Sequence, residues 1–544
     1  MTRAVPIGVI AIGALAAGIF VATSPGRAER KVVNQFVQAW QHGDYRRMYA
    51  LLDEDSKSKM SEKQFIAAYR KAADTATLIA VTPVKVGNKQ HDAYPVRMRV
   101  HTRLFGTLSE TMGIHVSGSG SRVTVKYNSG LVFPGLRPGE KLEHRVHLAP
   151  RAALLASDGT PLAEGPDRTT PIPDVAQQIA GTVGKIPTAE VDKYVNEGYP
   201  HNAQVGLDGM EKIFQDQLAG TPGGTLLAGH RKLASTKAVA GHDIHTTINP
   251  SIERAAIAAE AGRYAGIVAM DPRTGAILGV AGVGFSALQP PGSTMKIITV
   301  TSALEANVAK PSSTYAAASS ANVGGYTLHN AGGEVCGGTL INAFAVSCNS
   351  VFAPLAVKVG AKKFVDTAEK FGFNQQPSIS TAAESSIPAA NKMGGDVALG
   401  SSGIGQDRVQ ASALEMTDAA AAIAMHGKRP LPTLQAHQPP HFVHVTSARV
   451  AGQVEKMMVA VVQYGTGTPA QIPGVEVAGK TGTAELRNTD APGNDSPQNT
   501  DSWFVGFAPA GKPKIVVGAL FPEQGAGAQT AAPAVQQVLQ AALH

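Results

Sequence analysis

The sequence feature that most constrains this chain is the segment Pro290-Pro291-Gly292-Ser293-Thr294-Met295-Lys296, a loop that leads into an apolar helix. Residues three apart lie on one helical face, so we expect the Ser293 hydroxyl and the Lys296 amine to meet. A lysine activates a serine as its base only when the amine is neutral, and burial or a nearby cation lowers its pKa accordingly. Alone, this spacing also arises by chance, as a pair on a helix surface.

Two later segments carry polar groups that suit the same chemistry. Ser347-Cys348-Asn349 supplies a hydroxyl and an amide, and Lys480-Thr481-Gly482-Thr483 supplies a cation, two hydroxyls and a glycine that lets backbone approach a ligand. Ser-x-x-Lys, Ser-Asp-Asn and Lys-Thr-Gly, in this order, characterise penicillin-binding proteins and serine β-lactamases. The chain therefore resembles the penicillin-binding protein transpeptidases, with Cys348 at the middle of the second motif.

This resemblance implies four catalytic residues. Ser293 would attack a carbonyl, with Lys296 as its base. Lys480 would keep the Lys296 amine partly neutral and attract a substrate carboxylate, and Ser347 would relay a proton to the leaving amine.

The resemblance also implies a set of substrate-binding residues. Asn349 would hold the substrate backbone, and the hydroxyls of Thr481 and Thr483, with Gly482 between them, would hold its carboxylate. Backbone N–H groups of Ser293 and Thr483 would form an oxyanion hole, each donor being worth about 3 kcal/mol. The family's substrate is the D-Ala-D-Ala end of a peptidoglycan stem peptide, and β-lactams acylate the same serine.

Length and composition place these motifs in a multidomain protein. A chain of 544 residues exceeds one ordinary domain, and 43% hydrophobic with 16% charged residues indicates a globular chain. The net charge of +7 favours anionic surroundings such as lipid headgroups or cell-wall polymers. No basic run with interleaved aromatic residues indicates a nucleic-acid partner, and we expect no cofactor.

Residues Ala4 to Ala22 are almost entirely apolar and uncharged, about the length of helix that crosses a bilayer. A cleaved signal peptide is the alternative, but the apolar run exceeds a usual signal core. We therefore expect residues 4–24 to form a single-pass anchor in the cell membrane, with the catalytic domain outside the cytoplasm. The absence of a nearby cysteine excludes a lipoprotein anchor.

The pattern after this segment changes from helical to strand-like. Apolar residues first recur at helical spacing, from Val32 to Trp40 and behind a capping box that begins at Ser61. They then alternate with arginines from Val96 to Leu104. Helices followed by an antiparallel meander predict a cone-shaped α+β domain at 27–138, similar to the NTF2-like N-terminal domain of the methicillin-resistance type.

Residues 139–245 resemble the pedestal, or dimerisation, domain of the family and are rich in Pro, Gly and Thr. Arg151 opens this segment as in the family, but the Asp-Arg pair that the family usually has near Ala156-Ser157 is absent. Because no glycosyltransferase block precedes the pedestal, the chain resembles a class B enzyme. Such enzymes commonly act beside a membrane-embedded glycan polymerase.

Residues 246–544 are expected to form the transpeptidase domain, an α/β-type, β-lactamase-like fold with a central antiparallel sheet flanked by helices. Apolar runs predict strands and turn residues predict a hairpin between the first two. The predicted elements are strands at 266–270, 276–280, 475–483, 502–507 and 515–520, and a closing helix at 531–543.

The cysteines are Cys336 and Cys348, twelve positions apart. In an oxidising compartment they would form a disulfide that pins the loop presenting Ser347 and Asn349, worth about 3 kcal/mol on the chain-entropy estimate. Two free thiols are the alternative. Because alternate residues of an extended loop face opposite ways, we expect Cys348 to point away from the pocket.

Other functions remain open at this point. A serine β-lactamase or D,D-carboxypeptidase would share the acylation machinery, and a non-catalytic β-lactam-binding wall scaffold would use the same pocket without turnover. A metal site at His437, His441 and His444 is a further alternative, but these residues lie in a proline-rich loop without a carboxylate. We expect no metal.

Overall fold

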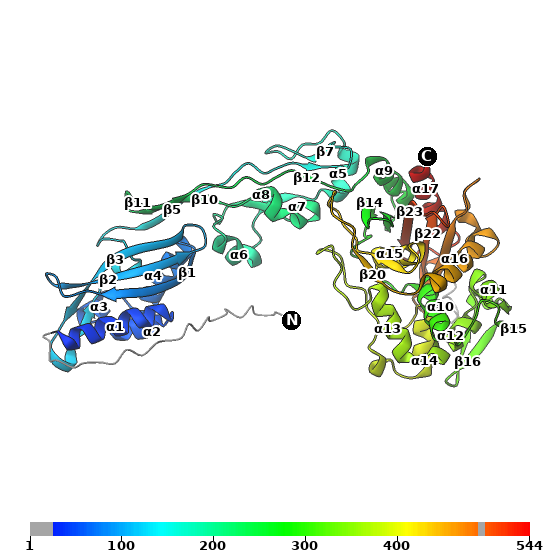
Figure 1. Cartoon of the computed structure of the whole chain (residues 1–544), viewed down its shortest axis with the longest axis horizontal. Helices are drawn as coiled ribbons and strands as arrows, with labels where there is room; N and C mark the ends of the chain where they lie inside the picture. Colours follow the sequence, from blue (N-terminus) through cyan, green and yellow to red (C-terminus); the bar gives the residue numbers. More distant parts are fainter. Residues whose placement is uncertain (1–25, 488–495) are drawn as a thin grey trace. The chain divides into compact units, whose positions relative to one another are not determined.

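The computed structural model of the chain describes residues 26–487 and 496–544 (Figure 1). They divide into two compact units. One comprises the described residues up to Leu148 together with Thr188–His201 and Pro222–Ala238, and the other comprises Ala149–Pro187, Asn202–Thr221 and Val239–His544. The residues 139–245 that the sequence assigns to a single pedestal are thus shared between both units.

The first unit begins with helices and continues as an antiparallel sheet, as the change of period predicts. Its helices are α1 (Arg27–Gln41), α2 (Tyr45–Ala50), α3 (Glu54–Lys59) and α4 (Glu62–Thr75), and its first sheet has the order β1-β2-β3-β4, formed by β1 (Leu78–Val86), β2 (Ala93–Thr102), β3 (Gly106–Ser117) and β4 (Thr124–Lys126). The capping box is present at the start of α4, where Ser61 and Gln64 bond each other's backbone.

Burial in β2 follows the expected alternation. Val96, Met98 and Val100 are fully buried, while Arg97 and Arg99 are exposed. Helices α1 and α4 pack against this sheet (Figure 1). The last strand, β4, is short, and residues 120–122 before it form a 3-10 turn. The same unit contains a second sheet of order β11-β10-β5, formed by β5 (Leu142–His147), β10 (Gly223–Ala228) and β11 (Arg231–Thr236).

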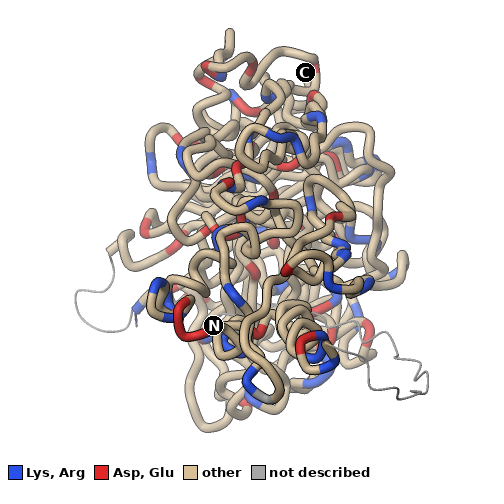
Figure 2. The backbone as a smooth tube through the Cα atoms, turned by 90° about the vertical axis from the view of Figure 1, so that its left-hand side faces the viewer, with Lys and Arg blue, Asp and Glu red and all other residues tan. Residues whose placement is uncertain are grey.

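Basic and acidic residues are interspersed along the backbone among a majority of other residues (Figure 2). Within residues 26–487 and 496–544, no helix combines the length and apolar character that crossing a bilayer requires. The expected anchor, Ala4 to Ala22, lies outside the described residues.

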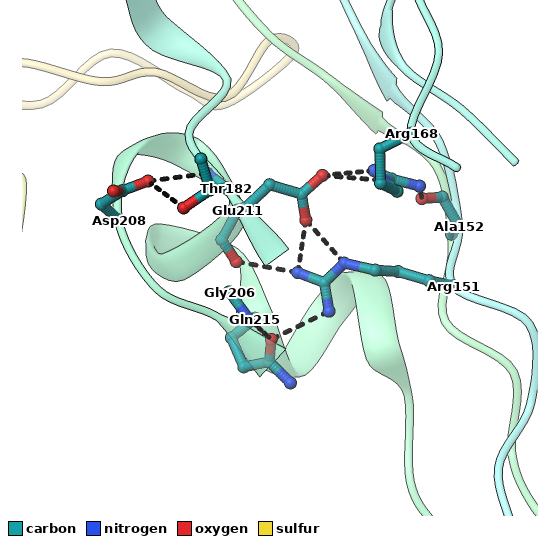
Figure 3. A network of polar contacts seen from close by, with 8 residues as sticks. All are labelled: Arg151, Ala152, Arg168, Thr182, Gly206, Asp208, Glu211 and Gln215. Atoms are coloured by element: carbon teal, nitrogen blue, oxygen red, sulfur yellow. Dashed lines mark hydrogen bonds and ion pairs between the residues drawn. The ribbon is translucent and has the colours of Figure 1, made fainter. Parts of the chain in front are cut away.

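A buried ion cluster stabilises the part of the second unit that precedes the catalytic fold (Figure 3). Glu211, in the short helix α7 (Gly209–Ile213), is 1% exposed. Arg151 Nε donates to Glu211 Oε2 at 2.6 Å, and Arg168 Nε donates to Oε1 at 2.8 Å. Arg151 also donates to Gln215 Oε1 at 2.8 Å. Arg151 therefore has a carboxylate partner although the Asp-Arg pair of the family is missing, and Arg168 supplies the second guanidinium.

The catalytic fold is built on a five-stranded antiparallel sheet of order β14-β13-β23-β22-β21. The strands are β13 (Gly266–Asp271), β14 (Ala276–Gly282), β21 (Ala478–Glu485), β22 (Thr500–Ala508) and β23 (Ile515–Phe521). The hairpin of β13 and β14 is as predicted. The strand predicted at 475–483 instead begins at Ala478, because residues 472–475 form a turn.

Helices cover both faces of this sheet, which explains the nearly continuous apolar runs in its strands. On one face, Ile267 and Ala269 of β13 pack into a cluster with α9 (Pro250–Glu260) and α17 (Ala531–Leu543). On the other face, Val268 and Met270 belong to the main core. That core also contains α10 (Lys296–Glu305), α12 (Asn349–Val359), α15 (Ala413–Ala424) and α16 (Ala448–Gln463). The closing helix has the predicted bounds.

Candidate active site

Ser293 lies in a 3-10 turn, η4 (Gly292–Met295), that runs directly into α10, rather than in the first turn of the α-helix itself. Gly292 has a φ of 51°, and a Cβ there would lie 2.7 Å from the Thr483 carbonyl oxygen. On its other side, the Gly292 N–H donates to the Gly405 carbonyl at 2.9 Å. A glycine is therefore required for the turn to approach β21, and the half-buried Ser293 stands beside that strand.

Lys296 is fully buried at the start of α10. Its Nζ donates to the Ser347 carbonyl at 2.7 Å, to Ser347 Oγ at 3.2 Å and to Asn349 Oδ1 at 2.7 Å. Within the described residues, the amine thus bonds the second motif and not the Ser293 hydroxyl. Burial, followed by the charge of Lys480, holds the pKa of Lys296 well below its ordinary value. The amine is therefore suited to act as a base.

Ser347 stands between the two lysines. Lys480 Nζ donates to Ser347 Oγ at 2.9 Å and to the carbonyl oxygen of Thr481, the residue that follows Lys480, at 3.0 Å. Lys480 is fully buried, and burial lowers its pKa to about 7. All three motifs therefore meet at one hydroxyl, and two amines of low pKa contact it. This arrangement would allow a proton to pass between either amine and the hydroxyl.

The Ser347-Cys348-Asn349 segment is a turn into a helix, which corrects the expectation of an extended loop. Ser347 has a φ of 64°, Cys348 is the N-cap residue of α12, and Asn349 is the first residue of that helix. Asn349 also donates to the His329 carbonyl at 3.0 Å. The left-handed backbone at Ser347 turns its neighbours to different sides, so Cys348 is buried while the side chains of Ser347 and Asn349 face Lys296.

The structure links Cys348 to Cys336 in a disulfide, with their Cα atoms 5.8 Å apart. Cys336 begins strand β18 (Cys336–Thr339), which pairs with β15 (Thr314–Ala318). The bond therefore joins this small sheet to the turn that carries Ser347 and Asn349.

The third motif lies on β21, the edge strand of the sheet beside the Ser293 turn. Thr481 Oγ1 lies 2.5 Å from Thr466 Oγ1 in a hydrogen bond, and Thr483 Oγ1 accepts from the Gly527 N–H at 3.2 Å. A Cβ on Gly482 would lie 2.8 Å from the Pro291 carbonyl oxygen, so this glycine also allows the turn to approach. Among the described strands none pairs with the outer edge of β21, so an extended ligand could pair there.

Sequence reasoning missed one residue that supports this site. Asn330 is 6% exposed, and its Oδ1 accepts from the Ser350 N–H at 2.7 Å in the first turn of α12. Its Nδ2 donates to the carbonyls of Ala318 and Glu334, each at 2.8 Å. Asn330 belongs to an irregular stretch without apolar periodicity, so no pattern in the sequence singled it out.

The three histidines considered as metal ligands are spread along residues 437–444. His437 stacks edge-on against His245 with the ring centres 6.3 Å apart. In the part of the chain that the structure describes, no group of three or more His, Cys, Asp or Glu side chains is placed to hold a metal ion.

The transpeptidase half of the chain matches the family model of the penicillin binding protein transpeptidase domain over residues 265–540. The chain belongs to the penicillin-binding protein transpeptidases. Residues 28–140 match the NTF2-like N-terminal transpeptidase domain, and residues 148–246 match the penicillin-binding protein dimerisation domain. This order of domains makes the chain a class B penicillin-binding protein with a serine transpeptidase domain.

Named relatives and solved structures agree with this assignment. Over 368 residues the penicillin-binding protein is 31% identical to peptidoglycan D,D-transpeptidase PbpA of Mycolicibacterium smegmatis, covering 56% of this chain and 73% of the relative. The D,D-transpeptidase domain of a peptidoglycan glycosyltransferase from Eggerthella lenta is 30% identical, with a TM-score of 0.59 over 73% of this chain and 98% of that one. Penicillin-binding protein A from M. tuberculosis, solved as a ceftriaxone acyl-enzyme complex, is 25% identical, with a TM-score of 0.57 over 73% of this chain and 98% of that one.

Proposed function

We propose that this chain cross-links peptidoglycan stem peptides as a D,D-transpeptidase. Ser293 attacks the carbonyl of the penultimate D-Ala, the terminal D-Ala leaves, and an amine from a neighbouring strand resolves the acyl-enzyme. The observation that carries this proposal is the convergence of Lys296 and Lys480 on the Ser347 hydroxyl, beside the Ser293 turn. A buried amine of low pKa next to a serine is the requirement for this nucleophilic chemistry.

The order of proton movements follows from the contacts. As a base, Lys296 is a neutral amine with two N–H groups and one lone pair, so it keeps at most two of its three present contacts, with Ser347 O, Ser347 Oγ and Asn349 Oδ1, while the lone pair takes the Ser293 proton. Ser347 then gives its hydroxyl proton to the leaving amine and regains one from Lys296, whose Nζ contacts its Oγ. Lys480, with the hydroxyls of Thr481 and Thr483, binds the substrate carboxylate, and backbone N–H groups of Ser293 and Thr483 bind the oxyanion.

Mass spectrometry of the intact protein after treatment with benzylpenicillin tests the proposal. We expect a stable adduct on the wild-type chain and none on Ser293→Ala. Steady turnover of benzylpenicillin would favour a serine β-lactamase, and release of D-Ala without cross-linking would favour a D,D-carboxypeptidase. Equal or absent labelling of both proteins would support a non-catalytic scaffold.

We infer further that the catalytic domain acts outside the cytoplasm, held by a single-pass anchor at residues 4–24. The apolar, uncharged run from Ala4 to Ala22 supports this inference. The domains would then be an NTF2-like domain at 27–138, a pedestal at 139–245 and a transpeptidase domain at 246–544, a division supported by family-model matches at 28–140, 148–246 and 265–540. Carbonate extraction of membranes, comparing the full chain with a chain that begins at Arg27, tests the anchor.

A membrane-embedded glycan polymerase is the partner that fits such an enzyme, because cross-linking requires freshly made glycan strands. Cross-linking at a photoreactive residue in the first unit, followed by mass spectrometry, would identify it. Capture of no membrane protein would count against this partner.

A further inference from the structure

The segment from Glu523 to Thr530, which joins β23 to α17, lies against the end of β21 that carries Thr483. The Gly527 N–H donates to Thr483 Oγ1 at 3.2 Å. A Cβ on Gly527 would lie 2.3 Å from the Trp503 carbonyl oxygen and 2.4 Å from that of Gly482. The backbone of this segment therefore contacts both β21 and β22, and only glycine fits there.

This contact affects what the Thr483 hydroxyl can do. A hydroxyl has one proton to donate and two lone pairs to accept with. Because Oγ1 already accepts from Gly527, its proton remains available for an anion on the open side of β21. The segment thus prepares Thr483 to donate to the carboxylate that the proposed function assigns to it.

Two consecutive residues of β22 hold the segment in place. Asp501 Oδ1 accepts from the Glu523 N–H at 2.9 Å. Ser502 Oγ donates to the Ala526 carbonyl at 3.1 Å and accepts from the Ala531 N–H at 3.1 Å. In the sheet register, Ser502 is opposite Thr483, so the attachment points lie directly beside the residue that they would position.

Asp501 is fully buried, and no donor among the described residues reaches its second oxygen, Oδ2. Burial raises the pKa of Asp501 to about 6, the Glu523 N–H bond opposes this rise, and the nearby Glu523 carboxylate adds to it. Of the elements packed against β22, the strand β21 carries Lys480 and Glu485, α15 carries Glu415 and Asp418, and η4, β23 and α17 carry no acidic or basic side chain. Burying a carboxylate that has a single backbone hydrogen-bond partner costs free energy, which indicates that this hydrogen bond has a functional role.

We propose that Asp501 is a positioning residue for the reaction: it fixes residues 523–527, whose Gly527 N–H orients the Thr483 hydroxyl toward the carboxylate of the acyl donor. This inference rests on the proposed function. Asp501 itself touches no substrate.

The test uses the full chain and two probes, benzylpenicillin and its methyl ester, which lacks the carboxylate. Acylation rates are followed by intact mass. Asp501→Ala is expected to lower the rate with benzylpenicillin about tenfold and to leave the rate with the ester unchanged within about twofold, because only the carboxylate contact is lost. Gly527→Ala is expected to give the same selective loss, and Gln529→Ala, at an exposed position of the same segment, is the matched control.

Asp501→Asn keeps an acceptor oxygen but removes the charge, so its effect on the acylation rate is expected to depend on pH. At about pH 8 it is expected to fall between the wild type and Asp501→Ala, since charge-assisted hydrogen bonds are stronger than neutral ones. At about pH 5, where Asp501 is itself protonated, it is expected to match the wild type. Equal losses on both probes, or no loss in folded Asp501→Ala and Gly527→Ala, would overturn the inference alone. Absence of any Ser293 adduct on the wild-type chain would overturn the proposed function as well.

Discussion

At the scale of single residues, the site depends on two lysines that are buried close together. Each amine loses hydration, and the positive charge of Lys480 further lowers the pKa of Lys296. Both lysines can be fully buried because their N–H groups have hydrogen-bond acceptors. Ser347 Oγ contacts both amines, Asn349 Oδ1 accepts from Lys296, and Thr481 O accepts from Lys480. In the proposed mechanism, one amine is available as a base while the other binds an anion.

Replacing Lys480 by methionine tests this division of roles. Lys480→Met keeps an unbranched side chain of similar length but removes the like charge, so the pKa of Lys296 rises and the acidic limb of the acylation profile moves to higher pH. The rate with benzylpenicillin at neutral pH is expected to fall by about 10²-fold, a typical loss for a group that stabilises charge in a transition state. Rapid-quench kinetics from about pH 5 to pH 9 measure both effects. An unchanged acidic limb would show that Lys480 does not control Lys296.

The residue types of the site could be predicted from the sequence, but the contacts between them could not. The motifs identified Ser293, Lys296 and Lys480 because their chemistry depends on short spacings. The partners of Lys296 depend on the left-handed backbone at Ser347, a non-glycine position that sequence rules assign to extended structure. The site therefore contains a Lys296–Asn349 contact where the spacing predicted Lys296–Ser293.

At the scale of elements, the disulfide joins the small β15–β18 sheet to the start of α12. Removing it with Cys336→Ser and Cys348→Ser is expected to cost about 3 kcal/mol of unfolding free energy, the chain-entropy value for a loop of this length. Because the Ser347 turn would lose one of its attachments, acylation by benzylpenicillin should slow as well. Calorimetry and acylation kinetics of the double variant measure these effects.

Treatment of the wild type and the double variant with a reductant is the control for the role of the disulfide. Mild reduction should slow the wild type to the rate of the double variant and leave the double variant unchanged. If both proteins respond alike, the effect of the reductant lies elsewhere in the assay.

Besides the disulfide, Asn330 holds the start of α12, and replacing Asn330 tests this contact. Its amide satisfies the Ser350 N–H and two carbonyls, so Asn330→Ala leaves buried backbone groups without partners. The expected loss of stability is about 2 kcal/mol, with slower acylation because Ser350 follows Asn349 directly. Asn322→Ala is the matched control, since Asn322 is exposed and, among the described residues, its Oδ1 accepts only from the Gly325 N–H. Equal melting temperatures for the two variants would contradict this role.

Regular elements were the most predictable part of the fold. The strands β13, β22 and β23 and the helix α17 were predicted to within two residues, because their apolar runs are continuous. Strands β15 to β18, which include β16 (Ser320–Val323) and β17 (Tyr326–His329), were not predicted, since residues 314–339 are rich in Ala and Gly and show no period. Their pairing depends on contacts with α11 (Leu340–Ala345), α12 and α14 (Asp396–Gly403), which local patterns do not contain.

At the scale of the whole molecule, neither compact unit is one continuous segment of the chain. The strand β5 pairs with β10, some eighty residues later, and this pairing places part of the expected pedestal in the first unit. The rest of the expected pedestal, including the Arg151–Glu211 cluster, belongs to the second unit. A boundary drawn from composition alone cannot detect such exchanges, because the pairing is non-local.

Buried carboxylates make the stability of the second unit depend on pH. Burial raises the pKa of Glu253 to about 8, that of Glu415 to about 8 and that of Asp418 to about 7. A folded-state pKa above the unfolded value means that the folded chain binds more protons, so these groups stabilise it at low pH and lose that effect progressively as pH rises from about 4, the unfolded-state pKa, to the folded-state pKa of about 7 or 8. The buried lysines change stability with pH in the opposite direction. Because their pKa is lowered, the folded chain binds fewer protons than the unfolded chain when pH is below the ordinary lysine pKa.

The effect of one carboxylate can be isolated by comparing the wild type with Glu253→Gln. Glu253 Oε2 accepts from the Val280 N–H at 2.6 Å, and the glutamine retains an oxygen for this bond. From about pH 5 to pH 7, the variant should gain stability relative to the wild type by about 1.4 kcal/mol per pH unit, because the wild type must keep a proton that the unfolded chain releases. Denaturant titrations at several pH values measure this slope, and the lysines cancel in the difference. A constant difference between the two proteins would mean that Glu253 is ionised in the folded chain throughout this range.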